Sequence, residues 1–200
     1  MSVLFAISAP SGTGKSTLLQ AVSAADPRLT FSRSYTTRAP RGVEQHGVHY
    51  YFTSREEFQS RITADEFLEY AKVFGNYYGT HRSEIARAAE SGQDLVMDID
   101  VQGARQLKEK VPDAVLIFVL PPDRAELERR LRARSEDPAS VIERRLQEAH
   151  AELKEYEIYD YILINDQLEM AVCDLQAIIR AERLRRHRMA NQATTLLAQF

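Results

Sequence analysis

The chain has 200 residues, of which 44% are hydrophobic and 28% charged, values typical of a globular protein and unlike those of disordered or fibrous chains. Its 26 Lys and Arg residues are nearly balanced by 29 Asp and Glu residues, which excludes an overall basic chain and argues against a nucleic-acid binder. A single cysteine, no apolar run near the ~20 residues of a transmembrane helix, and an apolar start too short for a signal peptide predict a cytoplasmic protein without a membrane segment.

The first predicted elements are a buried strand, a glycine-rich loop and a helix. Val3–Ile7 is a continuous apolar run, typical of a strand covered on both faces in a parallel sheet. The helix is predicted from about Ser16 to Ala25, ending near Pro27. The loop between them has the sequence Ala9-Pro10-Ser11-Gly12-Thr13-Gly14-Lys15-Ser16-Thr17.

This loop has the composition of a phosphate-binding loop. Gly12 and Gly14 let the backbone approach a ligand closely, and N–H groups at a helix N-terminus bind phosphate oxygens. Lys15 is placed to reach the β- and γ-phosphates of a nucleotide, and the Ser16 hydroxyl to ligate Mg²⁺. We therefore expect residues 9–17 to bind ATP, although Ala9 stands where the strict motif has glycine. The alternative is a glycine-rich turn without a ligand.

The stretch from 31 to 80 departs from this pattern and predicts a small inserted α+β lobe. Its strand-like pieces include Val48–Phe52 and Phe67–Phe74. Arg38 and Arg41 flank a proline, and paired guanidinium groups suit a phosphate dianion. Tyr50 and Tyr78 can add hydroxyl donors. The alternative is a solvated basic loop with locally packed tyrosines.

Strands alternate with helices in the rest of the chain. Further strands are predicted at Asp94–Ile99, Ala114–Leu120 and Tyr161–Ile164, and helices at roughly 101–110, 123–134 and from Gln167 to Arg188. This alternation favours an α/β fold with a mostly parallel central sheet. The segment 124–145 contains seven arginines and one proline between two helical patterns, which predicts a mobile helical lid.

Two aspartates end the strand that precedes residue 101. Asp98 and Asp100 are two residues apart, so their side chains are expected on the same side, at the carboxyl end of the sheet where such folds bind ligands. The alternative for Asp100 is a cap of the next helix.

The C-terminal region carries weaker signals. The arginines 183, 185, 186 and 188 indicate a solvated helix end, and Cys173 is interpreted as a packing residue. The tail, 191–200, is expected either to dock on a partner subunit or to fray, which leaves homo-oligomerisation open.

The phosphate loop does not belong to a GTPase of the usual kind. The chain contains no Asn-Lys pair and therefore lacks the Asn-Lys-x-Asp motif that recognises guanine in GTPases. It is also too short for a large motor or helicase, so a small kinase remains.

Four segments resemble guanylate kinases. They are Ser-x-Ser-x-Thr-Thr-Arg-x-Pro-Arg from Ser32 to Arg41, Gly-Asn-Tyr-Tyr-Gly-Thr from Gly75 to Thr80, Leu-Val-Met-Asp-Ile-Asp-Val-Gln-Gly from Leu95 to Gly103, and Ile-Asn-Asp from Ile164 to Asp166. The resemblance spans nearly the whole chain. It implies a single domain with the P-loop nucleoside-monophosphate-kinase fold, in which helices flank a central parallel sheet. The expected parts are a core (1–32, 92–123 and 149–190), an α+β GMP-binding lobe (33–91) and a helical lid (124–148).

The resemblance implies transfer of the γ-phosphate of ATP to GMP, and it assigns the acceptor site. The GMP phosphate is assigned to Arg38, Arg41, Tyr50 and Tyr78, and guanine to Glu69, Ser34 and Thr80, with Asp98 on the GMP side. A carboxylate can accept hydrogen bonds from both guanine N1–H and the exocyclic amine, whereas adenine has no N1–H. The alternative for Glu69 is an exposed strand carboxylate.

The same resemblance assigns the ATP side. Lys15, Arg134 and Arg145 are expected to stabilise the transferring phosphoryl group, Asp100 and Ser16 to lie at Mg²⁺, and Asn165 to lie near adenine. Four other arginines, 129, 130, 132 and 144, are expected on solvated or ion-paired helix faces.

Two rival functions remain open. One is a kinase for a phosphorylated sugar, which would not need residues that recognise a base. The other is a non-catalytic protein-binding module.

Overall fold

The computed structural model describes residues 2–73, 75–134 and 138–200. Their main layer is a parallel sheet of β1 (Leu4–Ser8), β2 (Leu29–Phe31), β7 (Asp94–Asp98), β8 (Val115–Leu120) and β9 (Tyr161–Ile164). The strand order is β2-β7-β1-β8-β9, and each neighbouring pair is parallel. The predicted α/β fold is confirmed, but β2 was not predicted, because three residues are too few for a periodic pattern.

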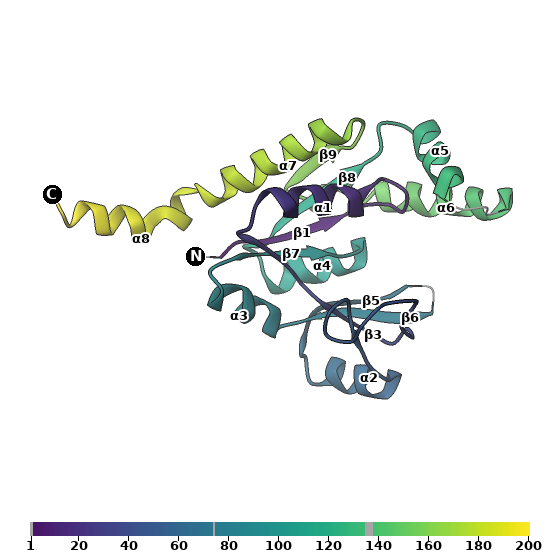
Figure 1. The fold of residues 1–200 in the computed structure, drawn as a ribbon, viewed down its shortest axis with the longest axis horizontal. Coiled ribbons are helices and arrows are strands. Elements are labelled where there is room, and N and C mark those ends of the chain that lie inside the picture. The colour runs from purple at the N-terminus through teal and green to yellow at the C-terminus, as the bar shows by residue number, and fades with distance from the viewer. Residues whose placement is uncertain (1, 74, 135–137) are drawn as a thin grey trace.

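Helices cover both faces of this sheet (Figure 1). On one face lie α1 (Lys15–Ala25) and α7 (Leu168–Arg183), and on the other α3 (Ser83–Glu90) and α4 (Val101–Lys110). The central strand β1 is buried throughout, with Phe5 and Ile7 in the cluster under α1 and α7, and Leu4 and Ala6 in the cluster under α4. Burial on both faces explains why its sequence is continuously apolar.

A second sheet forms the lobe at the lower edge of the molecule in Figure 1. Its strands are β3 (Ser34–Thr36), β4 (Tyr51–Phe52), β5 (Phe67–Val73) and β6 (Asn76–His81), in the order β4-β3-β6-β5, and α2 (Arg55–Thr63) packs on them. The Phe58 ring of α2 stacks on Phe67 at a centroid distance of 4.5 Å. Phe74, which the sequence analysis includes in the strand of β5, lies outside the described residues.

Two consecutive helices, α5 (Arg124–Arg134) and α6 (Ala139–Leu153), form the region predicted as a lid. They bury a separate apolar cluster of Leu127, Leu131, Ile142, Leu146 and Ala149. This cluster joins the two helices to each other and to the phosphate loop, because the side chains of Leu127 and Leu131 lie against Gly12.

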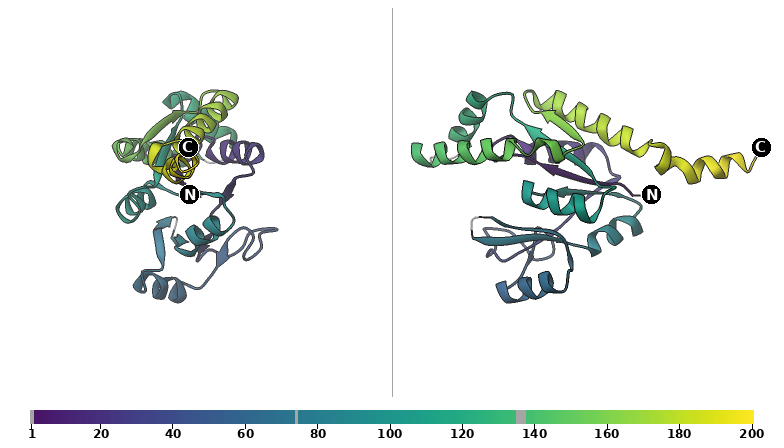
Figure 2. Two further views of the ribbon diagram at one scale, coloured as in Figure 1. Left: turned by 90° about the vertical axis from the view of Figure 1, so that its left-hand side faces the viewer. Right: turned by 180° about the vertical axis from the view of Figure 1, so that it is seen from behind.

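The last helix, predicted from Gln167 to Arg188, ends earlier than expected, so the predicted end is wrong. Helix α7 stops at Arg183, and after a break at residues 184 and 185 a further helix, α8 (Arg186–Leu197), continues into the tail for which docking on a partner subunit or fraying is expected. Buried Glu182 pairs with Arg185 and Arg188 beyond the break, and it also accepts the hydroxyl of Tyr161 on β9 at 2.5 Å, a tertiary contact that local propensity does not predict. Helix α8 buries none of its residues and projects from the body (Figures 1 and 2).

No helix in the described ranges is both long and apolar enough to cross a membrane.

Candidate functional site

The loop between β1 and α1 has the backbone geometry of an anion-binding turn. Gly12 and Gly14 have φ values of 94° and 90°, which only glycine adopts readily, and Gly14 directly precedes the helix. The Thr13 N–H donates to Pro10 O at 3.3 Å, while Ser16 and Thr17 are exposed on the first turn of α1. Ala9 is not among the residues with positive φ, so alanine is tolerated there without strain.

Two side chains support this loop from behind. The Asn165 amide, buried at 4% exposure, donates to Thr13 O at 2.7 Å, and a Cβ on Gly14 would lie 2.7 Å from the same amide nitrogen. Arg130 donates to Thr13 O at 3.1 Å and to Asn165 O at 2.9 Å. Sequence reasoning missed these roles, because Arg130 is one of several lid arginines and only its position in the fold distinguishes it. The predicted contact of Asn165 with adenine stays a prediction.

Lys15 lies where the loop meets the end of β7. Its ammonium pairs with the Asp98 carboxylate and donates to Ile99 O at 3.3 Å. Asp100 caps α4, since its Oδ1 accepts the Gly103 N–H at 2.8 Å, so the predicted cap is confirmed, while its place at Mg²⁺ stays a prediction. Asp98 and Asp100 nevertheless line one cavity together with Lys15, as the spacing of two predicted.

The three predicted base-recognition residues form one row across the lobe. Ser34 of β3 is paired with Thr80 of β6, and Thr80 with Glu69 of β5. Glu69 is 4% exposed, so the alternative of an exposed carboxylate is wrong. Its Oε1 accepts the Thr80 N–H at 3.0 Å. Burial raises the pKa of Glu69 to about 7, and the negative charge of Asp100 acts in the same direction.

The predicted phosphate-binding residues lie at the other end of the lobe. Arg38 donates to both carboxylate oxygens of Glu44 at 2.9 Å, and its guanidinium lies 5.4 Å from the Tyr50 ring centroid. Tyr50 and Tyr78 meet edge to face, 6.2 Å between centroids. Glu44 also accepts the Arg41 N–H at 2.8 Å, so one carboxylate holds both arginines of the loop. The Arg41 side chain itself is exposed.

A cavity of about 320 Å³ connects these groups. It opens between the parallel sheet and the lobe, and its charged and hydroxyl-bearing lining comprises Lys15, Ser32, Ser34, Tyr50, Glu69, Tyr78, Asp98 and Asp100. The structure thus brings most of the predicted acceptor residues to one space. Thr80 lies between the lining residues Ser34 and Glu69 in the sheet, and Arg38 lies against Tyr50. Arg41 does not line the cavity.

The lid reaches the loop through Arg145, whose Nη2 donates to Ser11 Oγ at 2.7 Å. Arg134 ends α5, but its side chain lies outside the described part of the structure. Arg129, Arg132 and Arg144 pair with glutamates three or four residues away on their own helices, as expected. Arg130 also pairs with Glu126, in addition to its contacts with the loop.

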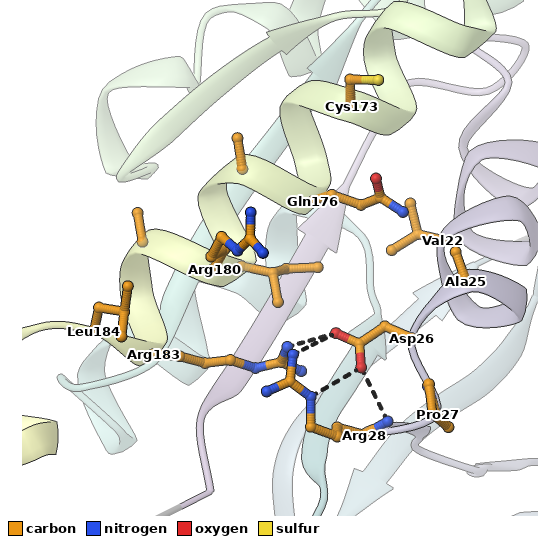
Figure 3. A pocket seen from close by; sticks show the side chains of 13 residues that line it. Val22, Ala25, Asp26, Pro27, Arg28, Cys173, Gln176, Arg180, Arg183 and Leu184 are labelled. Carbon is orange, nitrogen blue, oxygen red and sulfur yellow. Dashed lines mark hydrogen bonds and ion pairs between the residues drawn. The ribbon is translucent and has the colours of Figure 1, made fainter.

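A second cavity, of about 770 Å³, lies away from the loop between the end of α1 and α7 (Figure 3). At its wall Arg183 bridges Asp26 and Asp94, which fastens α7 to the sheet, so the prediction of a solvated Arg183 is wrong. Cys173 is exposed beside this cavity, not packed as predicted. These contacts are structural and add nothing to the site.

Known proteins match this chain over the parallel sheet, the lobe and the lid. The family model for guanylate kinase matches residues 2–182. A guanylate kinase of Koribacter versatilis is 56% identical over 186 residues, which cover 92% of this chain and 80% of that protein. One of Salmonella typhimurium is 48% identical over 199 residues, covering 98% and 96%. The crystal structure of guanylate kinase from Anaplasma phagocytophilum superposes with a TM-score of 0.73 at 34% identity, covering 94% of this chain and 89% of that one.

Proposed function

The chain belongs to the guanylate kinase family and is an ATP:GMP phosphotransferase, and we propose that the transfer takes place in the cavity between the parallel sheet and the lobe. GMP occupies the lobe side of this cavity and the phosphates of ATP lie on the loop before α1. A 5′-phosphate oxygen of GMP attacks the γ-phosphorus, the bond from that phosphorus to the β,γ-bridging oxygen breaks, and GDP and ADP result.

Guanine is recognised by the row of Glu69, Ser34 and Thr80. The carboxylate accepts the N1–H and exocyclic amine hydrogen bonds, and the hydroxyls donate to O6. The observation that carries this proposal is the burial of Glu69 in a cavity that also holds Lys15. A buried carboxylate without a cationic partner is costly unless it accepts hydrogen bonds, and guanine would add two donors to the one that Thr80 supplies.

The phosphate of GMP binds to Arg38, Arg41, Tyr50 and Tyr78. In the ligand-free protein Glu44 neutralises Arg38, and the Arg38 guanidinium holds the pKa of Glu44 below its usual value. A phosphate dianion offers the same bidentate acceptor geometry as this carboxylate. GMP binding therefore exchanges one anionic partner of Arg38 for another.

On the ATP side, the backbone N–H groups of residues 9–17, of which Pro10 has none, surround the phosphates, and Lys15 neutralises charge on the transferring group. Arg145, already at Ser11, adds a second cation, and Arg134 is proposed as a third. Phosphoryl transfer needs positioning and charge stabilisation more than covalent participation by the protein, which suits this set of residues. Asn165, which donates to the loop, is proposed to lie near adenine.

The donor set beside Lys15 fits Mg²⁺. Ser16 and Asp98 line one shallow depression, and Asp98 and Asp100 line the cavity, so hard oxygen donors are present on both sides. The described residues hold no group of three or more His, Cys, Asp or Glu that would bind a metal alone. Mg²⁺ in kinases is commonly held by one or two carboxylates and the substrate phosphates, so this set is sufficient. We assign Ser16 and Asp100 to it. Mg²⁺ bound with ATP offsets the negative charge of the phosphates.

A coupled assay with ATP tests the proposal, using GMP, AMP, CMP, UMP and ribose 5-phosphate as acceptors. We expect GMP to exceed AMP in kcat/KM by about 10⁴ or more, since sites built on such hydrogen bonds reject analogues that lack them. If AMP and GMP had equal kcat/KM values, the proposed recognition of guanine would be wrong. Preference for ribose 5-phosphate would indicate a sugar-phosphate kinase, and no turnover with any acceptor would indicate a binding module.

A further inference from the structure

Helix α4 lies along the free edge of the lobe sheet. Strand β5 is the last strand in the order β4-β3-β6-β5, so it pairs with β6 on one side only. Its other side faces α4, which begins at the cavity with Asp100. An edge strand presents backbone N–H and C=O groups that need partners when they are buried. The partners here come from side chains of a helix that belongs to the core.

Gln106 supplies two of these partners at one residue. Its Oε1 accepts the Tyr70 N–H at 3.1 Å, and its Nε2 donates to Tyr70 O at 2.7 Å. The carboxamide thus pairs with β5 as a residue of a neighbouring strand would. Tyr70 directly follows Glu69, so Gln106 holds the backbone next to the base-recognition carboxylate.

The contacts on either side of Gln106 follow the same face of α4. Lys110 donates to Phe67 O at 2.9 Å, and Leu68 packs in the core cluster that contains Leu107. Residues 103, 106, 107 and 110 are spaced i, i+3, i+4 and i+7, which places them on one helical face. The residues of β5 that flank Glu69, which are Phe67, Leu68 and Tyr70, are therefore all held against α4.

Gly103 is the member of this face that meets Glu69 itself. A Cβ on Gly103 would lie 3.1 Å from Glu69 Cδ and closer still to Oε2. The helix backbone thus limits how far the carboxylate can turn on one side, while the Thr80 N–H holds Oε1 on the other. Glycine is not required here for the backbone, since its φ is not positive. The space it leaves is occupied by Glu69.

We infer that Gly103 and Gln106 are positioning residues that determine base selectivity, because together they set the place and orientation of the Glu69 carboxylate. This inference rests on the proposed role of Glu69 in binding guanine. Two parallel hydrogen bonds to N1–H and the amine need both oxygens in the plane of the base. A carboxylate that turns or shifts keeps its charge but loses one of the two bonds, and the advantage of guanine over adenine falls.

The first test is Gln106→Met, which keeps the length of the side chain and removes both hydrogen bonds to Tyr70. We expect the ratio of kcat/KM for GMP to that for AMP to fall at least about tenfold, the equivalent of one charged hydrogen bond. KM for GMP should rise while KM for ATP stays within about twofold. Glu109→Met is the matched control, since Glu109 is exposed on the same helix and outside the face that meets β5.

The second test is Gly103→Ala, which separates positioning from folding. Alanine favours a helix over glycine, which offsets part of the cost of moving the buried carboxylate, so the variant should remain folded at the assay temperature, as its melting curve will show. Its Cβ nevertheless displaces the Glu69 carboxylate. We expect base selectivity to fall at least about tenfold in a fully folded protein, again with KM for ATP unchanged.

The outcomes distinguish this inference from the proposed function. If wild-type protein prefers GMP but Gly103→Ala keeps that preference in full, the positioning inference is wrong and the function stands. If both variants lose kcat for GMP and AMP equally, the role of this face is structural and the inference is also wrong. If the wild type itself does not distinguish GMP from AMP, the proposed role of Glu69 fails first.

Discussion

The lobe and the lid both approach the phosphate loop, but they are held in different ways. In the lobe, Glu69 is buried and its strand is attached to α4 through backbone groups on both sides. In the lid, the apolar residues pack mainly against each other, and Arg129, Arg132 and Arg144 form exposed ion pairs within their own helices. Two other lid arginines, Arg145 and Arg130, donate hydrogen bonds to the phosphate loop.

This difference indicates a division of work between the two regions. Rigid, buried groups suit the choice of a base, because selectivity depends on hydrogen bonds made at fixed positions. Long charged side chains on an exposed hairpin suit the stabilisation of charge that develops during transfer. Changes in the lobe should therefore alter KM and selectivity, and changes at the loop and lid should alter kcat. The following predictions test that division, in order of expected effect.

Lys15→Ala should cause the largest loss, since Lys15 is the cation at the meeting point of loop and sheet. We expect kcat to fall about 10²–10³-fold or more, as for the loss of one preorganised electrostatic group. GMP affinity, measured by calorimetry, should change little. Lys154→Ala on the exposed end of α6 is the control, and near-normal turnover of Lys15→Ala would remove this lysine from the mechanism.

Arg145→Ala should lower kcat about a hundredfold, because the other loop cations remain to share the charge. KM for GMP should be nearly unchanged. The neighbouring Arg144 is the matched control, since it pairs with Glu148 on the same helix and not with the loop. Equal effects of Arg144→Ala and Arg145→Ala in steady-state assays would contradict the division between lid and lobe.

Glu69→Gln should lower kcat/KM for GMP at least about tenfold, since one acceptor oxygen becomes a donor amide and a charged hydrogen bond is lost. The difference in kcat/KM between GMP and AMP should become smaller, while KM for ATP is unchanged. Glu56→Gln, an exposed carboxylate of α2 in the same lobe, should behave as wild type. Unchanged selectivity in Glu69→Gln would show that guanine is recognised elsewhere.

GMP affinity should depend on pH through Glu69. Its pKa is about 7 in the free protein, and guanine donors lower it in the complex by favouring the charged form. Affinity is therefore complete above pH 7 and is lost as pH falls through that value, by up to about tenfold per unit. Binding should release a proton near pH 6, detectable by calorimetry in buffers of different ionisation enthalpy.

Glu69→Gln is also the control for this pH dependence, because the second pKa of the GMP phosphate, about 6, lies in the same range. The variant keeps the contribution of the phosphate and should lose that of the carboxyl group. An unchanged proton release on GMP binding in the variant would contradict the assignment.

The pH dependence of folding has the opposite sign. The ligand-free protein should lose stability as pH rises from 4.5 to about 7, because the unfolded chain releases the Glu69 proton at a lower pH than the folded protein does.

The smallest effects distinguish two adjacent lid arginines. Arg130→Ala removes the hydrogen bonds to Thr13 O and Asn165 O, one to each, and should raise KM for ATP several-fold through a less ordered loop. Arg129→Ala removes only an exposed ion pair and should leave kcat and both KM values within about twofold. Steady-state kinetics in both substrates separate the two, and identical behaviour would remove the supporting role of Arg130.

Local sequence was enough to predict several parts of this protein. The buried strand, glycine loop and helix at residues 3–25 follow from periodicity and from the backbone demands of Gly12 and Gly14, which act over a few residues. The row of Ser34, Glu69 and Thr80 was reached through resemblance to a family, not from spacing, since these residues come from three strands.

Only the tertiary structure decided which members of similar sets have distinct roles. Arg129 and Arg130 are indistinguishable in sequence, yet one faces water and the other supports Thr13, a residue 117 positions away. Likewise, nothing local marks Gln106 as the partner of Tyr70, or Glu182, at the end of α7, as the partner of Tyr161. The physical reason is that helix and turn formation depend on neighbours along the chain, whereas the satisfaction of buried polar groups depends on whichever distant segment the packing of the core brings beside them.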